Sequence, residues 1–279
     1  MKLTDSPIAD VFALDTLHHE LAGTPFAGKV RHFPTIDSTN TLAMREAERG
    51  QESGTVYLAD EQTGGRGRGA HEWHSAAGSG LYVSILVRPQ IAPADILWLS
   101  LAAGLAVQAA LRDVTSLAPD IRWPNDLLLS GRKMGGILTE LNAEVTRVRH
   151  AVIGIGLNVH QPSFPAELAT LATSLKIETG RDWSRQDLLV ALLRHLNQEI
   201  EHLTTPHRLE SATADIRSRL AASSTWVQGK SVIVTEADTF SGITDGLDNR
   251  GFLRVRTAHG IRTVLSGGVR AGGVREGRS

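Results

Sequence analysis

The chain has no cysteine among its 279 residues. This absence excludes a disulfide framework, a zinc or iron–sulfur centre with cysteine ligands, and a thiol nucleophile. Long apolar runs are also missing: the longest, residues 96–111, contains Ser100, Gly104 and Gln108 and falls short of the roughly twenty residues of a membrane span. We expect a buried helix there. No apolar core follows the first ten residues, so we expect no signal peptide, no membrane partner and a cytoplasmic location.

A large excess of charge of one sign is missing as well. The net charge is −1, so no global field draws the whole chain onto nucleic acid or an anionic membrane. This balance hides a difference along the chain: residues 226–279 hold eight basic and five acidic residues, whereas residues 1–225 carry a net −4. Short β-like runs separated by turns begin at the same point. We therefore predict a larger domain over residues 1–225 and a small all-β domain over residues 226–279.

Hydrophobic periodicity predicts both helices and strands in the larger domain. We expect strands at 29–33, 55–59, 81–87 and 150–159, a hairpin at 127–141, and helices at 38–49, 93–112 and 185–203. The fold class that follows from the pattern is a mixed α and β domain followed by a small β domain.

The segment from Gln62 to Trp73 is rich in glycine and contains Arg66 and Arg68. Glycine lets the backbone approach a ligand closely, arginine binds carboxylates or phosphates through paired hydrogen bonds, and tryptophan stacks on flat rings. These parts suit a loop that binds an acid next to a nucleotide. A mobile surface loop and an RNA-binding segment are the alternatives. A Walker A loop and a dinucleotide-binding glycine motif do not match the spacing.

Two further segments place polar or charged residues at the ends of expected strands. Asn125 and Asp126 follow a Trp-Pro pair; an aspartate there suits a Mg²⁺ contact, although Pro-Asn-Asp is also typical of a turn. Lys133 precedes Gly135 and Gly136 inside an apolar run. It either offers positive charge to a phosphoryl-bearing centre or belongs to a solvated hairpin turn.

Glycines alternate along the strand expected at 150–159, at Gly154 and Gly156, with Asn158 near its end. Glycine weakens a strand and often marks the close approach of another group to the backbone. That group is either a ligand, with Asn158 on a phosphate or ribose, or another element that crosses the strand. The eleven histidines show no metal-ligand spacing, and no Ser-His-Asp set can be proposed.

Taken in order, these motifs resemble those of bacterial biotin–protein ligases, also called biotin–[acetyl-CoA-carboxylase] ligases. The matching segments are Asp37-Ser38-Thr39-Asn40, Gln62-Thr63-x-Gly65-Arg66-Gly67-Arg68 with Trp73, Arg122-Trp123-Pro124-Asn125-Asp126, Lys133-x-Gly135-Gly136-Ile137-Leu138 with Glu140, and Gly154-x-Gly156-x-Asn158. The combination is specific although each motif is not. The resemblance implies an α+β fold in which a mixed, largely antiparallel sheet packs with helices, as in class II synthetases and biotin–lipoate ligases, followed by a small C-terminal β-barrel.

The resemblance also implies a two-step reaction. Biotin attacks the α-phosphate of ATP to give biotinyl-AMP and pyrophosphate, and a lysine of a biotin carboxyl carrier protein then attacks the mixed anhydride. By this resemblance the catalytic residues are Lys133, Arg66 and Arg68, and Asp126 is the Mg²⁺ contact. The expected biotin contacts are Ser38, Thr39, Asn40, Gln62, Gly65, Arg66, Gly67, Arg68, Lys133, Gly135 and Gly136. The expected ATP contacts are Arg66, Arg68, Trp73, Asn125, Asp126, Lys133 and Asn158.

The chain departs from the family pattern at three places. Ala70-His71-Glu72 stands where the family has Gly-Arg-x, so a third loop arginine is missing and loop ordering and retention of the intermediate are in question. Arg122 stands where the family has lysine, which keeps the charge. Only 29 residues precede Val30, too few for the DNA-binding winged helix of some relatives, so we expect no DNA partner. The resemblance also implies a homodimer. A lipoate or octanoate ligase and a non-catalytic biotin-binding protein are the alternative functions.

Overall fold

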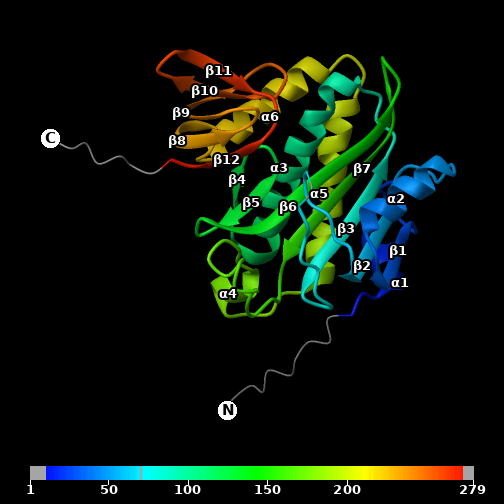
Figure 1. The fold of residues 1–279 in the computed structure, drawn as a ribbon. Helices are drawn as coiled ribbons and strands as arrows, with labels where there is room; N and C mark the ends of the chain where they lie inside the picture. Colours follow the sequence, from blue (N-terminus) through cyan, green and yellow to red (C-terminus); the bar gives the residue numbers. More distant parts are fainter. Residues whose placement is uncertain (1–10, 70, 273–279) are drawn as a thin grey trace.

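A seven-stranded sheet forms the centre of the molecule in the computed structural model, which describes residues 11–69 and 71–272. Its strands, from one edge to the other, are β1 (Val30–Ile36), β2 (Val56–Gln62), β3 (Gly80–Val87), β7 (Val148–Asn158), β6 (Arg132–Ala143), β5 (Asp126–Leu129) and β4 (Asp120–Arg122). β1 and β2 run parallel, and every other neighbouring pair of these strands is antiparallel. The predicted mixed, largely antiparallel sheet is confirmed (Figure 1).

Helices cover the two faces of this sheet unequally. The helices are α1 (Leu14–Glu20), α2 (Thr39–Glu48), α3 (Ile96–Thr115), α4 (Leu175–Thr179), α5 (Arg185–Thr204) and α6 (Leu209–Ser223). α3, α5 and α6 pack on one another and cover one face (Figure 1). On the opposite face, α2 packs against Tyr57, Leu86 and Val152. Because side chains alternate along a strand, Gly154 and Gly156 lie on the same face of β7 as Val152, beside α2.

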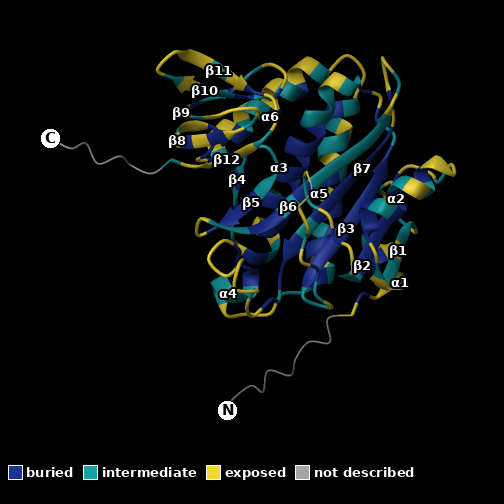
Figure 2. Cartoon of the chain, viewed as in Figure 1, coloured by how far each residue is buried: buried dark blue, intermediate teal, exposed yellow. Residues whose placement is uncertain are grey.

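The apolar run in the sequence is confirmed as a buried helix, α3, preceded by the short 3-10 turn η1 (Pro93–Asp95). Trp98, Leu99 and Leu101 are each 1% exposed or less. Among the described residues, the helical stretch 93–115 is the one long and apolar enough to cross a membrane, but 67% of its most apolar window is buried inside the protein (Figure 2). This burial is typical of a core helix.

Neither β4 nor α6 was predicted, because their sequence signals are weak. β4 has only three residues. α6 buries only Ala212, Ile216 and Leu220 of its fifteen residues, a single narrow stripe four residues apart. That stripe is narrower than the apolar face of an ordinary amphipathic helix, so periodicity alone did not separate α6 from its surroundings.

The C-terminal part is a five-stranded antiparallel sheet. Its strands are β8 (Gln228–Thr235), β9 (Thr239–Leu247), β10 (Leu253–Thr257), β11 (Gly260–Val264) and β12 (Gly268–Ala271), in the spatial order β11-β10-β9-β8-β12. Val232, Val234 and Val255 are fully buried on its inner side. The small all-β region is as expected. Within the part of the chain that the structure describes, however, β11 and β12 do not pair, so the strands form an open sheet and not a closed barrel.

Buried contacts join this second sheet to the central one. The indole N–H of Trp123, which is 2% exposed, donates to the carbonyl of Gly251 at 2.9 Å. The Ser224 hydroxyl donates to the carbonyl of Ile121 at 2.6 Å. One apolar core runs from the helices of the larger region into the second sheet. The domain boundary at residue 226 therefore remains a prediction from the sequence pattern, because side-chain packing is continuous across it.

We predict that Trp123→Phe lowers the free energy of unfolding by about 2 kcal/mol, because the buried Gly251 carbonyl loses its donor and a cavity remains. Urea denaturation followed by circular dichroism measures the change. Trp183→Phe is the control, since that indole is partly exposed and donates to the Thr179 hydroxyl near the surface. Equal losses for the two variants would contradict the role given to the Trp123 contact.

Candidate functional site

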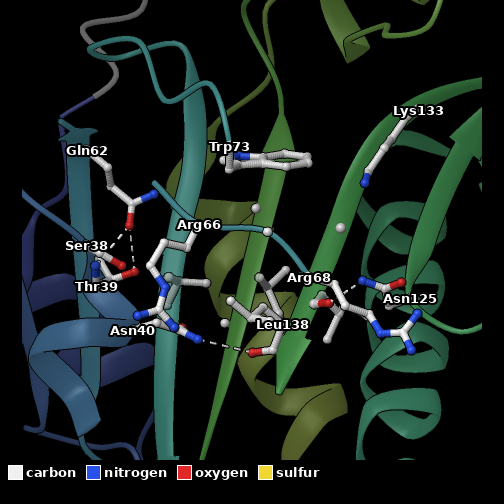
Figure 3. A pocket seen from close by; sticks show the side chains of 17 residues that line it. Ser38, Thr39, Asn40, Gln62, Arg66, Arg68, Trp73, Asn125, Lys133 and Leu138 are labelled. Carbon is white, nitrogen blue, oxygen red and sulfur yellow. Dashed lines mark hydrogen bonds between the residues drawn. The ribbon is translucent and has the colours of Figure 1, made fainter. Parts of the chain in front are cut away.

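A pocket lies on the same face of the central sheet as α2, on the part of that face that the helix does not cover. The glycine-rich loop that follows β2 lies over it. Its lining comes from the start of α2, from the loop and from the facing sides of β3, β6 and β7. The lining residues are Ser38, Thr39, Asn40, Gln62, Arg66, Gly67, Arg68, Trp73, Val83, Asn125, Lys133, Gly136, Ile137, Leu138, Gly154, Ile155 and Gly156 (Figure 3). Eleven of these were predicted as site residues; Gly65, Gly135, Asp126 and Asn158 do not line the pocket.

The start of α2 supplies a neutral polar corner of the pocket. Ser38 is the N-cap residue, and its hydroxyl accepts the N–H of Thr41 at 3.4 Å, as expected for a serine in that position. The Gln62 side-chain oxygen, at the end of β2, accepts both the backbone N–H and the hydroxyl of Thr39, at 2.9 and 3.0 Å. The Gln62 amide donates to Ser75 at 2.9 Å. These bonds fix hydroxyl and amide groups at one end of the pocket.

Asn40 joins α2 to the sheet. Its side-chain amide donates to the Leu138 carbonyl at 3.2 Å and to the Glu140 carboxylate at 2.9 Å, and its side-chain oxygen accepts from Ser84 at 2.5 Å. A Cβ atom on Gly154 would lie only 2.1 Å from that oxygen. The glycine is therefore required for Asn40 to reach the sheet.

The ring of Trp73 rests on two glycines that face each other across β6 and β7, Gly136 and Gly156. A Cβ on Gly156 would lie 2.6 Å from the indole, and one on Gly136 would lie 3.3 Å from it. The Lys133 ammonium lies 5.4 Å from the centroid of the ring, within reach of a cation–π contact. Of the two explanations for the alternating glycines, this structure shows the second: the approaching groups are protein side chains, those of Asn40 and Trp73.

Trp73 nearly fills the pocket, and its own indole N–H is left unpaired. About 40 Å³ of free space remains, which is room for a few water molecules. The Trp73 indole N–H is buried and has no hydrogen-bond partner among the described residues. With Trp73 in this position, the free space is too small for a ligand much larger than water.

The glycine-rich loop is a narrow hairpin. Arg66 and Glu72 form an antiparallel bridge, Gly67 N–H donates to the His71 carbonyl at 2.8 Å, and Trp73 N–H donates to the Gly65 carbonyl at 2.9 Å. A Cβ on Gly65 would lie 2.4 Å from the Trp73 carbonyl, so Gly65 allows the two arms to approach and does not face the pocket. Ala70, at the predicted departure from the family pattern, lies outside the described residues.

The two loop arginines are anchored on opposite sides of the pocket. Arg66 forms an ion pair with Glu140, a residue that sequence analysis left outside the site. Arg68 donates to the Gly267 carbonyl of the second sheet at 2.8 Å. Burial lowers the pKa of Arg68, although the charges of Asp126 and Glu236 act in the opposite direction.

Lys133 shares one carboxylate with an arginine. Its ammonium lies 2.6 Å from one oxygen of Asp126, and the other oxygen accepts two bonds from Arg122, at 2.6 and 3.1 Å. Burial alone raises the pKa of Asp126, but Lys133 and Arg122 outweigh it and hold that pKa below its usual value. Both oxygens are occupied by cations, and no group of three potential metal-binding side chains exists in the described ranges. Asp126 therefore does not fit the predicted Mg²⁺ contact.

The remaining predicted residues have structural partners. Asn125 lines the pocket and donates to the Ile137 carbonyl at 2.7 Å. Asn158 is 4% exposed and donates to the Thr173 carbonyl at 3.0 Å. A Cβ on Gly135 would meet Leu157 at 2.7 Å, so this glycine permits close packing on the other face of β6.

Comparison with known proteins identifies the family. The model of the biotin/lipoate A/B protein ligase family matches residues 32–158, and that of the biotin protein ligase C terminal domain matches residues 228–269. The chain belongs to this ligase family.

Individual relatives agree with that assignment. The bifunctional ligase/repressor BirA of Bacillus subtilis is 36% identical over 245 residues, which cover 85% of this chain and 72% of the relative. The biotin–[acetyl-CoA-carboxylase] ligase of Paracoccus denitrificans is 31% identical over 242 residues, covering 85% of this chain and 98% of the relative. A structure of biotin protein ligase from Aquifex aeolicus in complex with biotin and ATP has a TM-score of 0.74 at 30% identity, covering 88% and 100% of the two chains. The predicted enzyme class, biotin–[acetyl-CoA-carboxylase] ligase, is confirmed.

We predict that Asp126→Asn lowers the free energy of unfolding by about 2 kcal/mol at neutral pH, because it leaves two partly buried cations without their carboxylate. Since the native pKa of Asp126 is depressed, its contribution is complete above the unfolded value of about 4 and is lost as the pH falls through the native value. The difference between variant and parent should therefore shrink on acidification. Urea denaturation at a series of pH values tests this, with the exposed Asp113→Asn as the control. A difference independent of pH would refute the role of the ion pairs.

Proposed function

We propose that the chain activates biotin with ATP as biotinyl-AMP and transfers it to a lysine of a biotin carboxyl carrier protein. The observation that carries the proposal is the division of one pocket into two ends (Figure 3). Neutral hydroxyl and amide groups of Thr39 and Gln62 lie at one end, and the cations Lys133 and Arg68 lie toward the other, with Trp73 between them. A ligand with a polar ring head and a carboxylate tail, placed beside a polyphosphate, matches both ends.

The neutral end suits the ring of biotin. A urea group has N–H donors and a carbonyl acceptor, and Ser38, Thr39 and Gln62 offer both donors and acceptors there. Leu138 and Ile155 line the pocket beyond this corner and suit the apolar part of the molecule. An unbranched acyl chain has no groups to pair with the polar corner, which favours biotin over octanoate.

The cationic end suits the adenylation step. An oxygen of the biotin carboxylate attacks the α-phosphorus of ATP, a new P–O bond forms, and pyrophosphate departs with the electron pair of the bond that breaks. The two reacting anions repel each other. Arg68 and Lys133 at this end, and Arg66 once it exchanges Glu140 for the ligand, offset that repulsion and stabilise the charge that develops. In the second step a lysine amine of the acceptor attacks the acyl carbon, and AMP departs.

Asp126 allows Lys133 to engage the reacting groups at low cost. The carboxylate keeps its two bonds to Arg122 when the lysine leaves. Lys133 thus exchanges one anionic partner for another, while Asp126 remains paired. Closure of the loop over the anhydride excludes water and protects it from hydrolysis.

Other parts of the proposal rest on the family resemblance. Trp73 and Asn125 are proposed nucleotide contacts, and the unpaired indole N–H supports the first. Mg²⁺, a cytoplasmic location, the absence of a DNA partner and a homodimer remain predictions. Asn158 as a nucleotide contact also remains a prediction, although its amide is engaged with Thr173.

Pyrophosphate release with ATP and Mg²⁺ tests the substrate. We expect release that depends on biotin and exceeds that with lipoate or octanoate at least tenfold, because those acids leave the polar corner unpaired. Transfer is then followed by mass spectrometry of a purified carrier domain. Faster release with octanoate would instead make the protein a lipoate-type ligase. Biotin binding without any release would make it a non-catalytic binding protein.

We predict that Lys133→Gln lowers the rate of biotin-dependent pyrophosphate release by at least about a hundredfold, because one charge is removed from the developing transition state. The free energy of unfolding should change by only about 1 kcal/mol, since Arg122 still pairs with Asp126. Lys176→Gln is the control, because that lysine pairs with Asp182 at the surface. A near-parental rate for Lys133→Gln would show that this lysine is only a turn residue.

A further inference from the structure

The backbone of Lys133 is held by a segment outside the hairpin to which it belongs. Its N–H donates to the Leu171 carbonyl at 2.8 Å, and its carbonyl accepts the N–H of Thr173 at 2.9 Å. These bonds form a parallel bridge between Lys133 and Ala172. Both backbone polar groups of this one residue are thus bound to residues 171–173.

A bulge in the β5–β6 ladder accompanies this contact. Gly135 faces Leu127, whereas Lys133 faces the next residue of β5, Leu128. Met134 is therefore the extra residue, and it is fully buried. A bulge redirects the side chains beside it, and in this case Lys133 and Gly136 both line the pocket.

Thr173, on the holding segment, is itself fixed on two sides. It is fully buried, and its hydroxyl donates to Glu178 at 2.5 Å. Its carbonyl accepts the side-chain amide of Asn158 at 3.0 Å. The segment that binds Lys133 is therefore fastened both to β7 and to α4.

Glu178 also binds two residues that precede Lys133 in the chain. The oxygen that accepts from Thr173 also accepts from Arg132 at 2.7 Å, and the other oxygen accepts from Ser130 at 2.5 Å. Burial raises the pKa of Glu178, but the bonds from Ser130, Thr173 and Arg132 bring it below its usual value, so the carboxylate stays ionised at neutral pH. The Glu178 carboxylate thus links the turn before Lys133 to residues 171–173.

We propose that Thr173 and Glu178 are positioning residues that set the backbone of Lys133 so that its ammonium reaches the reacting carboxylate and phosphate. The inference rests on the proposed function of Lys133 in adenylation. A lysine side chain has four flexible bonds, so a fixed backbone is the means of limiting where its charge can lie. Neither residue lines the pocket, and both act through Lys133.

Thr173→Val tests the proposal, because it keeps the shape of the side chain and removes the bond to Glu178. We expect kcat for pyrophosphate release to fall on the order of tenfold, less than the roughly hundredfold cost of a full ångström of misplacement, with KM for biotin unchanged. Thr173→Ser should restore the rate, and Glu178→Gln should resemble Thr173→Val. The matched control is Thr115→Val, a buried threonine of α3 whose hydroxyl donates to Leu111 at 2.6 Å, which should keep the parental kcat.

A double-mutant cycle separates positioning from a general structural effect. In a Lys133→Gln background, Thr173→Val should have no further effect on kcat, because the charge that it misplaces is already gone. An equal fall in kcat in both backgrounds, or equal kcat values for Thr173→Val and Thr115→Val, would overturn the proposal.

Hydrogen exchange provides a readout that does not need activity. The amide of Lys133 should exchange faster in Thr173→Val than in the parent and Thr115→Val proteins, because its acceptor segment is loosened. An unchanged exchange rate would overturn the claim that Thr173 and Glu178 form a clamp that holds the Lys133 backbone through residues 171–173. A parent protein with no biotin-dependent pyrophosphate release would instead overturn the proposed function, and the two failures are thereby distinguished.

Discussion

The site depends on the close approach of two side chains to the backbones of β6 and β7. Asn40 lies against Gly154, and Trp73 lies against Gly156 and its partner Gly136, at distances that a Cβ atom on either β7 glycine would block. Asn40 carries the start of α2 to the sheet, and Trp73 carries the glycine-rich loop down onto it. These two contacts set the positions of the neutral and cationic ends of the pocket.

Each cation of the pocket has a protein partner. Arg66 pairs with Glu140, Arg68 binds the Gly267 carbonyl, and Lys133 pairs with Asp126. The charges are thus kept close to the pocket without being left unpaired, which would be costly in a partly buried site. A near-zero net charge for the whole chain carries no information about this local arrangement.

The sequence predicted those features whose signal is local. Strong apolar periodicity located the central strands and α3, and the glycine-rich segment with Arg66, Arg68 and Trp73 located the loop. Which groups approach the alternating glycines of β7 was left open, because that depends on how α2 and the loop fold back over the sheet. The clamp of Thr173 and Glu178 joins residues about forty positions apart along the chain, and no periodicity marks such a contact. The occupation of Asp126 by two cations is likewise a property of the assembled sheet.

The bond from Arg68 to Gly267 spans 199 positions along the chain. Glu236 holds the same turn of the second sheet by accepting the N–H groups of Leu265 and Ser266, at 3.0 and 2.7 Å. Movement of the loop and movement of that turn are therefore thermodynamically linked, and such linkage is reciprocal. A molecule that bound the second sheet and displaced this turn would change the affinity of the pocket, and a ligand in the pocket would change the binding of that molecule by the same factor.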